Sequence, residues 1–502
     1  MIRGLTFMFD RFIQLLPKSW KLQHPIEPTP TSTAAPAANS GKSPHISASA
    51  TATIIESRAL RIGKGIGFKK RLFYAVMFLF FFAPFMSLLI YSATGSKVVT
   101  AIPALLRDVI VLLSFLGVFL ARATIRGKSH TTMIYFMLLL LSIAVATLSS
   151  LYSAGGVPEI GELVKVLMNN IRRFIFPFVI FVYFYYFMNF SSIALAYRFA
   201  TIFWCFGVFE YLMPLAFWES MGLLDYWNEY SNSTASTGKT QGSLQGYDRF
   251  FTFDTYYILG YEARRMISFY LEPTTTAALA QGSVVLGILM KRPRLVALAV
   301  IGGLLTFSKG FIVFLLGLAP LVLLINKANV GILKLYVVAV AIVLFGSLIA
   351  GYFLYLQYPQ IIRIGLFAHL EGLYEYVTHF NPLGYGVGAV GSFRFEDNWG
   401  GDLDRVGVES SLANHISQLG VLGFASIALL FWHIKNILDG DKRGFYVLYM
   451  LIIYCFIFFT SNSATGYSGN FFIFFVIVAW FKYLSRVNPD ILRRQLSRKR
   501  SD

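Results

Sequence analysis

Long runs of apolar residues recur along the chain, separated by polar connections. A helix needs about 20 apolar residues to cross a bilayer core of about 30 Å, and runs of this kind repeat between residues 72 and 485. Backbone groups in lipid must bond within their own segment, and these runs are continuous where barrel strands would alternate. The pattern therefore predicts an all-α fold, a polytopic bundle of transmembrane helices.

We expect about twelve spans, joined mostly by short polar connections. They are placed near residues 72–92, 101–121, 131–151, 172–190, 193–217, 268–290, 294–307, 311–326, 334–356, 412–434, 445–461 and 469–485. Two longer connections, 218–267 and 357–411, then fall on one face. Loops of this length are usually functional.

Basic residues decide the orientation of the spans. Lys and Arg cluster just before the first span, in the connections ARATIRGKSH, KRPR, NKANVGILK and HIKNILDGDKRG, and after the last span. The positive-inside rule places such segments in the cytoplasm, so both termini are expected there and the two long loops on the outer face. This pattern also accounts for the net charge of +18, and no nucleic acid partner is predicted.

Composition divides the chain into three regions. It has 502 residues, of which 56% are hydrophobic and 14% charged. Residues 1–57 are rich in Pro, Ser and Thr and are expected to form a disordered cytoplasmic tail. A transmembrane catalytic domain is expected at 58–486, followed by a basic cytoplasmic tail at 487–502. The two cysteines lie inside apolar runs, so neither a disulfide framework nor a metal-ligand spacing is indicated.

Several arginines break the charge rule at the outer ends of the spans. They are Arg172, Arg173, Arg264, Arg265 and Arg363. Arg107 lies inside a span, where a charge costs at least ~2.5 kcal/mol. Asp108 follows it, but adjacent helical residues do not face each other, so this pair need not bond. The arginines at the outer face bind either lipid head groups or one shared anionic ligand, and we favour the shared ligand for the set.

Other polar residues stand beside the same face. TFSKG follows an apolar run too short to cross the bilayer, so Lys309 is expected at a helix break, either satisfying carbonyls or contacting a ligand. Glu409 precedes a span and is a candidate general base. His415 is interpreted as a structural residue. Asp402 and Asp404 match a DxD metal signature but are interpreted as part of a solvated loop.

Four motifs resemble the O-antigen polymerase and O-antigen ligase superfamily, membrane glycosyltransferases that use undecaprenyl-pyrophosphate-linked sugars. The motifs are RMISFYLEPTTTAALA, TFSKG, NPLGYGVGAVGSF and VESSLANHISQLGVLGF. Their order and placement between residues 70 and 485 carry the resemblance. It implies a GT-C-like bundle with two large periplasmic loops. Lys309 replaces the family's usual arginine, and Glu409 stands where ligases typically carry histidine, which favours the Wzy-type polymerases.

The resemblance implies transfer of a glycan from undecaprenyl pyrophosphate to a sugar hydroxyl at the periplasmic face, without a cofactor or metal. The expected catalytic residues are Arg265, Glu409 and Arg363. The expected substrate-binding residues are Arg264, Arg173, Arg172, Lys309, Trp227, Tyr256 and Tyr257. Expected partners are the lipid-linked oligosaccharide and membrane lipids. Whether a chain-length regulator protein also takes part stays open.

Two alternative functions stay open. One is a ligase that transfers the finished glycan to lipid A core or to a protein. The other is a polysaccharide flippase or transporter, a class that typically shows two related halves with broken helices in matching positions. The sequence contains no recognisable internal repeat, so the transporter is the less favoured of the two.

Overall fold

The computed structural model describes most of the apolar part of the chain. The described residues are 48–123, 137–145, 160–188, 190–214, 216–227, 257–258, 261–262, 264–357, 377–387, 411–438, 441–460 and 472–487. The chain divides into two compact units, Met1–Lys64 and Gly65–Asp502. Every helix from α3 onward belongs to the second unit.

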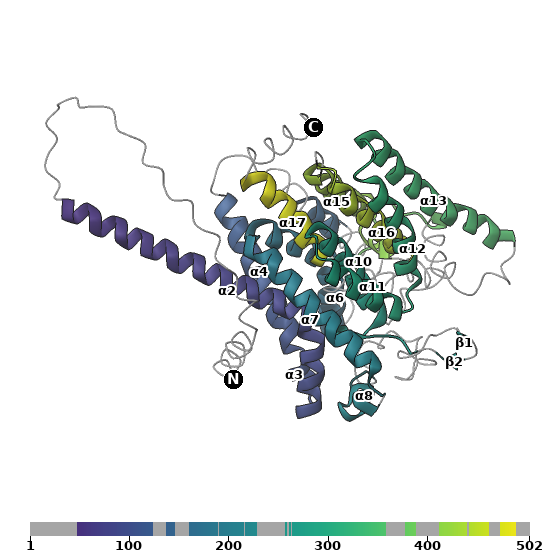
Figure 1. The fold of residues 1–502 in the computed structure, drawn as a ribbon, viewed down its shortest axis with the longest axis horizontal. Helices are drawn as coiled ribbons and strands as arrows, with labels where there is room; N and C mark the ends of the chain where they lie inside the picture. Colours follow the sequence, from purple (N-terminus) through teal and green to yellow (C-terminus); the bar gives the residue numbers. More distant parts are fainter. Residues whose placement is uncertain are drawn as a thin grey trace. The chain divides into compact units, whose positions relative to one another are not determined.

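Helices account for nearly all of the regular structure in these ranges (Figure 1). They are α2 (Ala48–Thr94), α3 (Lys97–Thr100), α4 (Ile102–Ala123), α6 (Ile160–Phe187), α7 (Phe190–Leu212), α8 (Ala216–Ser220), η3 (Ser268–Tyr270), α10 (Pro273–Leu289), α11 (Pro293–Leu305), α12 (Lys309–Leu324), α13 (Val330–Gln357), α15 (Ser411–Leu438), α16 (Gly444–Thr460) and α17 (Phe472–Val487). The strands β1 (Tyr257–Ile258) and β2 (Tyr261–Glu262) pair antiparallel. The all-helical class predicted from the sequence is confirmed.

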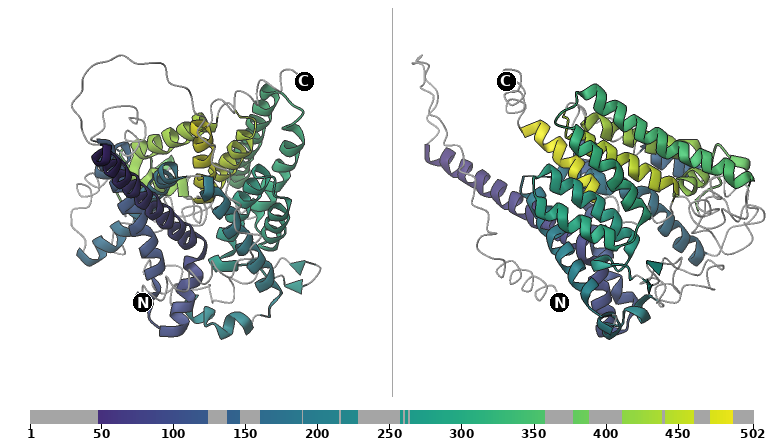
Figure 2. Two further views of the ribbon diagram at one scale, coloured as in Figure 1. Left: turned by 60° about the vertical axis from the view of Figure 1, so that its left-hand side comes forward. Right: turned by 45° about the vertical axis from the view of Figure 1, so that its right-hand side comes forward.

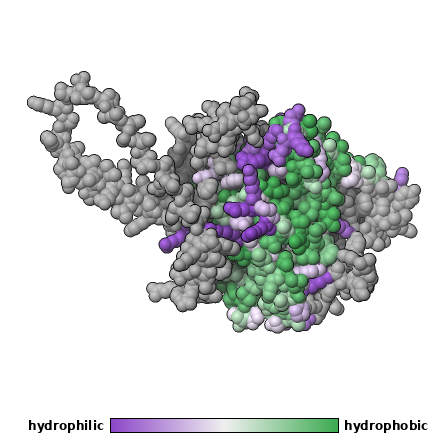
Figure 3. Space-filling view, in the orientation of Figure 1, coloured by the Kyte–Doolittle hydropathy of each residue, from purple (hydrophilic) through white to green (hydrophobic). Residues whose placement is uncertain are grey.

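Several helices are apolar enough to lie in a membrane. Four qualify as spans by length and composition: Arg71–Thr94, Ser192–Leu212, Val330–Ser347 and Leu412–Leu438. Shorter apolar helices include α10, α11 and α12. The second unit presents a broad hydrophobic surface (Figure 3), which suits contact with acyl chains. A helix lies at each predicted span where its residues are described, while the count of twelve remains a prediction.

The helices of the second unit pack around an aromatic core. α10 contacts α11 and α12, and α16 lies beside α12 (Figure 1). Phe206 of α7 stacks on Phe269 of η3 with ring centroids 3.9 Å apart, which holds η3 against α7. α13 packs on α12 and α16 along one side and exposes the other (Figure 2).

Two helices begin earlier than predicted. α2 starts at Ala48, inside the predicted disordered tail, because ASATATIIES contains neither Pro nor Gly to stop the helix. α6 starts at Ile160, so Arg172 and Arg173 fall inside a continuous helix instead of at the start of a span. Polar residues such as Glu162 are compatible with helix, whereas the predicted span covers only the apolar run. The helix therefore extends beyond the predicted start.

The predicted break before Lys309 is confirmed. α11 ends at Leu305 and α12 begins at Lys309. Between them Phe307 adopts a φ of +51°, which ends the helical geometry. The result is two short helices joined by the TFS segment.

Contacts between connections are consistent with the predicted alternation of the spans. The Lys442 ammonium, between α15 and α16, donates to the Ala328 carbonyl, between α12 and α13, at 2.8 Å. These two basic connections were both predicted to be cytoplasmic, and this bond places them at one end of the second unit. The C-terminal ends of α7 and α11 likewise meet, through the segment described below.

A turn from the second long loop docks into a kink of α15. The Tyr385 amide donates to the Ser417 carbonyl at 2.7 Å, and the Val421 amide donates to the Pro382 carbonyl at 2.9 Å. The turn therefore supplies hydrogen bonds to α15 where the helix is distorted. It joins two of the motifs noted in the sequence, NPLGYGVG and SQLGVLG.

Gly420 makes this docking possible. Its φ of 65° and ψ of −158° lie in a region that glycine alone adopts readily. A Cβ there would approach the Pro382 carbonyl oxygen to 2.3 Å, and a Cβ on Gly384 would approach the Gln418 carbonyl oxygen to 2.4 Å. Two backbones thus meet at a distance that leaves no room for a side chain.

Gly420→Ala is therefore expected to lower the stability of the purified protein by about 2 kcal/mol or more, because it adds backbone strain and a clash. Thermal unfolding in detergent measures the effect. Gly346→Ala in α13 is the matched control, since nothing lies within 4 Å of its added methyl group. An unchanged unfolding temperature for Gly420→Ala would contradict the docked geometry.

Candidate functional site

The segment Arg264–Ser268 runs between the C-terminal ends of two apolar helices, α7 and α11. On one side the Met266 amide donates to the Leu305 carbonyl at the end of α11, at 2.9 Å. On the other side the Ile267 and Ser268 amides donate to a carboxylate of α7. The segment leads into η3 and α10, so it is fixed at several points.

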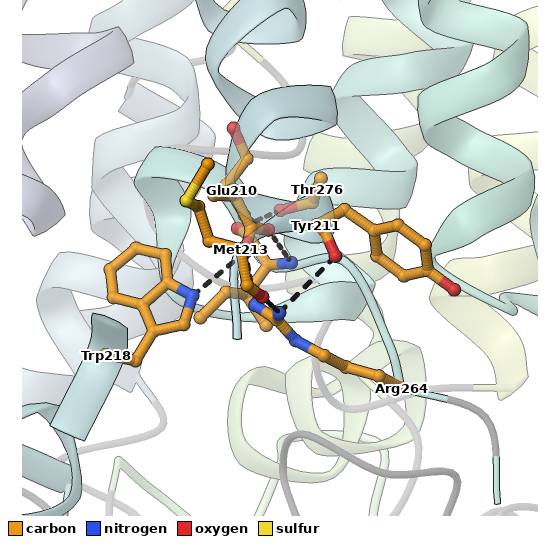
Figure 4. Close-up of polar contacts among 8 residues, drawn as sticks. Glu210, Tyr211, Met213, Trp218, Arg264 and Thr276 are labelled. Atoms are coloured by element: carbon orange, nitrogen blue, oxygen red, sulfur yellow. Dashed lines mark hydrogen bonds and ion pairs between the residues drawn. The ribbon is translucent and has the colours of Figure 1, made fainter. Parts of the chain in front are cut away.

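That carboxylate belongs to Glu210, in the last turn of α7, and it is completely buried. It accepts from the Arg264 guanidinium at 2.6 Å and from the Trp218 indole at 2.9 Å. It also accepts from the Ile267 and Ser268 amides, both at 3.0 Å (Figure 4). A buried charge is stable only when it is paired and hydrogen-bonded, and four donors meet this requirement here.

Arg264 also closes the end of α7. Its Nη1 donates to the Met213 carbonyl at 2.6 Å and to the Tyr211 carbonyl at 3.4 Å (Figure 4). The last carbonyls of a helix have no partner inside the helix and carry the negative end of its dipole. The guanidinium therefore bonds both to Glu210 and to the end of the helix. Its predicted contact with substrate stays a prediction.

Arg265 is held more lightly than Arg264. Its Nε donates to the Thr306 carbonyl at the end of α11, at 3.0 Å. Its two terminal amino groups make no hydrogen bond to any residue in the described part of the chain, and the side chain is only partly buried. Burial lowers the pKa of the Arg265 guanidinium from its ordinary value, and the negative charge of Glu272 opposes this effect.

Glu272 caps the first turn of α10. It accepts from the Thr275 amide at 3.1 Å and from the Thr274 and Thr275 hydroxyls. This role is typical of a residue at a helix N-cap. The carboxylate is thus fixed at a position from which it acts on Arg265 by charge.

Lys309 is the first residue of α12 and exposes its side chain. Lys309 comes three residues after Thr306, whose carbonyl accepts from Arg265. Arg265 therefore bonds to the start of the break between α11 and α12, and Lys309 stands at its end. The first turn of α12 adds amides with no partner inside the helix. Two cations beside a helix N-terminus form an arrangement suited to a phosphate or diphosphate.

Trp227 does not present its ring to solvent. It is 3% exposed, in a small cluster. The other buried members are Leu88, Trp218, Leu223, Ile267 and Leu271. Its predicted stacking on a sugar would require this cluster to open, and it remains a prediction.

The other predicted site residues are placed only in part. Tyr257 lies in β1 opposite Glu262. Arg172 and Arg173 lie in α6, and the structure does not describe their side chains. Outside the described residues lie Tyr256, Arg363, Asp402, Asp404 and Glu409.

Two polar residues inside apolar helices, His415 and Arg107, are buried and contact other residues of the protein. His415 of α15 is buried, and its ring lies edge-on to Phe174 at 4.8 Å. Arg107 of α4 is 2% exposed and donates from Nε to Asp108 at 2.8 Å. It also lies over the Phe80 ring at 5.0 Å. Although neighbouring helical positions diverge, the long arginine side chain folds back to reach Asp108, so this pair does bond.

The sequence reasoning missed Glu210. The signal was present, because a carboxylate near the end of an apolar run is rare and usually has a partner or a function. Glu210 lies in the sequence FEYL. Its pairing with an arginine of the EARR segment was not predicted, because that segment lies far along the chain.

Comparison with known protein families finds no matching family model, and comparison with curated proteins finds no match. The chemistry of the site is therefore argued from its own geometry.

Glu210→Ala is expected to destabilise the protein by about 3 kcal/mol, because it leaves the buried side of Arg264 without its carboxylate partner. Thermal unfolding in detergent measures this loss. Glu219→Ala, an exposed carboxylate on α8, is the control and should change stability by less than about 0.5 kcal/mol. Equal effects of the two substitutions would contradict the role of Glu210.

Proposed function

We propose that this protein is a polysaccharide polymerase, a glycosyltransferase of the bacterial inner membrane with both termini in the cytoplasm. It joins lipid-linked oligosaccharide repeat units at the periplasmic face. The glycan is transferred from undecaprenyl pyrophosphate to a sugar hydroxyl of a second unit. The observation that carries the proposal is Arg265, whose terminal amino groups are left unbonded by the described residues beside the break at Lys309.

The chemistry of the donor explains why an arginine serves this reaction. The pyrophosphate is already a leaving group, so neither a nucleotide nor a cofactor is needed. The protein must instead stabilise the negative charge that develops on the departing diphosphate. A guanidinium is planar and always charged, and it donates two parallel hydrogen bonds to phosphate oxygens.

The reaction is a displacement at the anomeric carbon. The acceptor hydroxyl oxygen forms a new bond to that carbon, and the bond from the carbon to the diphosphate oxygen breaks. The electron pair leaves with the diphosphate, beside Arg265 and Lys309. The hydroxyl proton passes to a base, for which Glu409 is the candidate.

The position of the site supports an enzyme acting on a lipid-linked substrate. The segment Arg264–Ser268 leads through η3 into the apolar helix α10, so the cations lie where a polar loop meets an apolar bundle. A diphosphate there can keep its polyprenyl chain in lipid. The order of the four motifs supports the superfamily, and Glu409 in place of the ligases' histidine supports the polymerase branch. In the structure two of these motifs are docked together at Gly420.

Arg265→Ala is expected to abolish polymer while the protein remains folded and inserted, since the charge on the leaving group loses its main partner. Purified protein is reconstituted with a lipid-linked repeat unit, and products are separated on a gel. Arg443→Ala, which removes an exposed arginine paired with Asp441, is the control and should form polymer like wild type. Normal polymer from Arg265→Ala would refute the assignment.

A deletion strain separates the polymerase from the other two functions. Loss of a polymerase leaves core lipopolysaccharide with a single repeat unit, whereas loss of a ligase leaves bare core. Loss of a flippase leaves lipid-linked repeats on the cytoplasmic side. Either of the last two results would replace the polymerase proposal.

A further inference from the structure

We infer that the two adjacent arginines have separate roles: Arg265 binds the diphosphate, while Arg264 and Glu210 form a positioning pair that does not touch it. The inference rests on the proposed function, and it deepens that proposal by assigning ligand binding to one arginine and positioning to the other. From the sequence, both arginines were expected to contact the substrate, Arg265 as a catalytic residue and Arg264 as a substrate-binding one.

The first argument is the direction of the two side chains. Arg264 bonds to the end of α7, at Met213, whereas Arg265 bonds to the end of α11, at Thr306. The two neighbouring guanidinium groups are therefore held at the ends of different helices.

The second argument is what Arg264 already holds. Its two terminal nitrogens bond to the Glu210 carboxylate and to the carbonyls of Tyr211 and Met213 at the end of α7 (Figure 4). Contact with a ligand would break these bonds and leave Glu210, with 0% exposure, without its counter-charge. Leaving a buried charge unpaired is strongly unfavourable. Arg265 can bind a ligand through its terminal amino groups without breaking a bond, because its single hydrogen bond uses Nε.

The third argument is that Glu210 fixes the backbone around Arg265. It binds Arg264 before that residue and the Ile267 amide after it. The Thr276 hydroxyl of α10 also donates to the Ile267 carbonyl, at 2.7 Å. The guanidinium of Arg265 thus projects from a backbone anchored on both sides, which lowers the entropy lost when a ligand binds.

The test measures binding of undecaprenyl diphosphate to the full-length protein in nanodiscs, at several salt concentrations. Arg265→Lys is expected to weaken binding at least 10-fold, because it loses the two-pronged contact, and Arg265→Met should also reduce the salt dependence. Arg264→Lys should weaken binding less than 3-fold. The neutral pair Glu210→Gln with Arg264→Met should bind within about 3-fold of wild type and keep its full salt dependence.

The neutral double variant distinguishes positioning from ligand contact. If Arg264 touched the diphosphate, this variant would lose salt dependence as Arg265→Met does, and that result would overturn the inference. Thermal unfolding confirms that each variant is folded. Should the double variant misfold, Arg264→Lys decides, since a loss equal to that of Arg265→Lys also overturns it. Arg443→Lys is the matched control.

Failure of the proposed function would look different. Wild-type protein that does not bind undecaprenyl diphosphate at all contradicts the diphosphate site itself. The positioning role of Glu210 is then read separately from amide hydrogen exchange, which Glu210→Gln should accelerate at Ile267 and Ser268. Unchanged exchange at these amides would contradict the positioning role, whatever the protein binds.

Discussion

The structure around the segment Arg264–Ser268 depends on one buried carboxylate. Glu210 has no exposed surface, and its two oxygens accept from an arginine, an indole and two backbone amides. These donors come from two parts of the chain, Trp218 of α8 and the segment Arg264–Ser268. A carboxylate in such a place is tolerated only with several donors, so the folding of α8, the Arg264–Ser268 segment and the start of η3 is tied to α7.

The same contacts explain why a cation is stable where the positive-inside rule, applied to the predicted orientation, does not expect one. Arg264 is compensated within the protein, by Glu210 and by carbonyls at the end of α7. Arg265 is compensated in part, by one carbonyl at the end of α11 and by the nearby charge of Glu272. The negative ends of two helix dipoles thus receive two neighbouring arginines. Arg265 is less fully compensated than Arg264, and it is therefore the better of the two for binding an external anion.

Much of the fold followed from apolar periodicity and length. The helical class, the short α11 and the break before Lys309 were predicted because each depends on local sequence. The starts of α2 and α6 were not, because helical residues outside an apolar run leave no hydropathy signal. The bond between Arg107 and Asp108 was missed because helix geometry gives the direction of Cβ and does not limit a long, flexible side chain.

The candidate site was predictable only as a set of cations. The position of Arg264 and Arg265 before an apolar helix was visible in the sequence, whereas their partners were not. Glu210 lies 54 residues before Arg264, and nothing local connects them. Trp227 looked available for a sugar because it stands in a polar loop, yet it is covered by residues from α2 and from the segment after Arg265. Burial of this kind is a tertiary property.

The docked turn at residues 381–387 has a consequence for the long connection between α13 and α15. By binding the kink at Gly420, it divides one long connection into two shorter ones, each closed at both ends. The entropy of closing a loop depends only weakly on its length. Either half can therefore gain or lose residues at little cost in closure entropy, while the turn between them keeps its register.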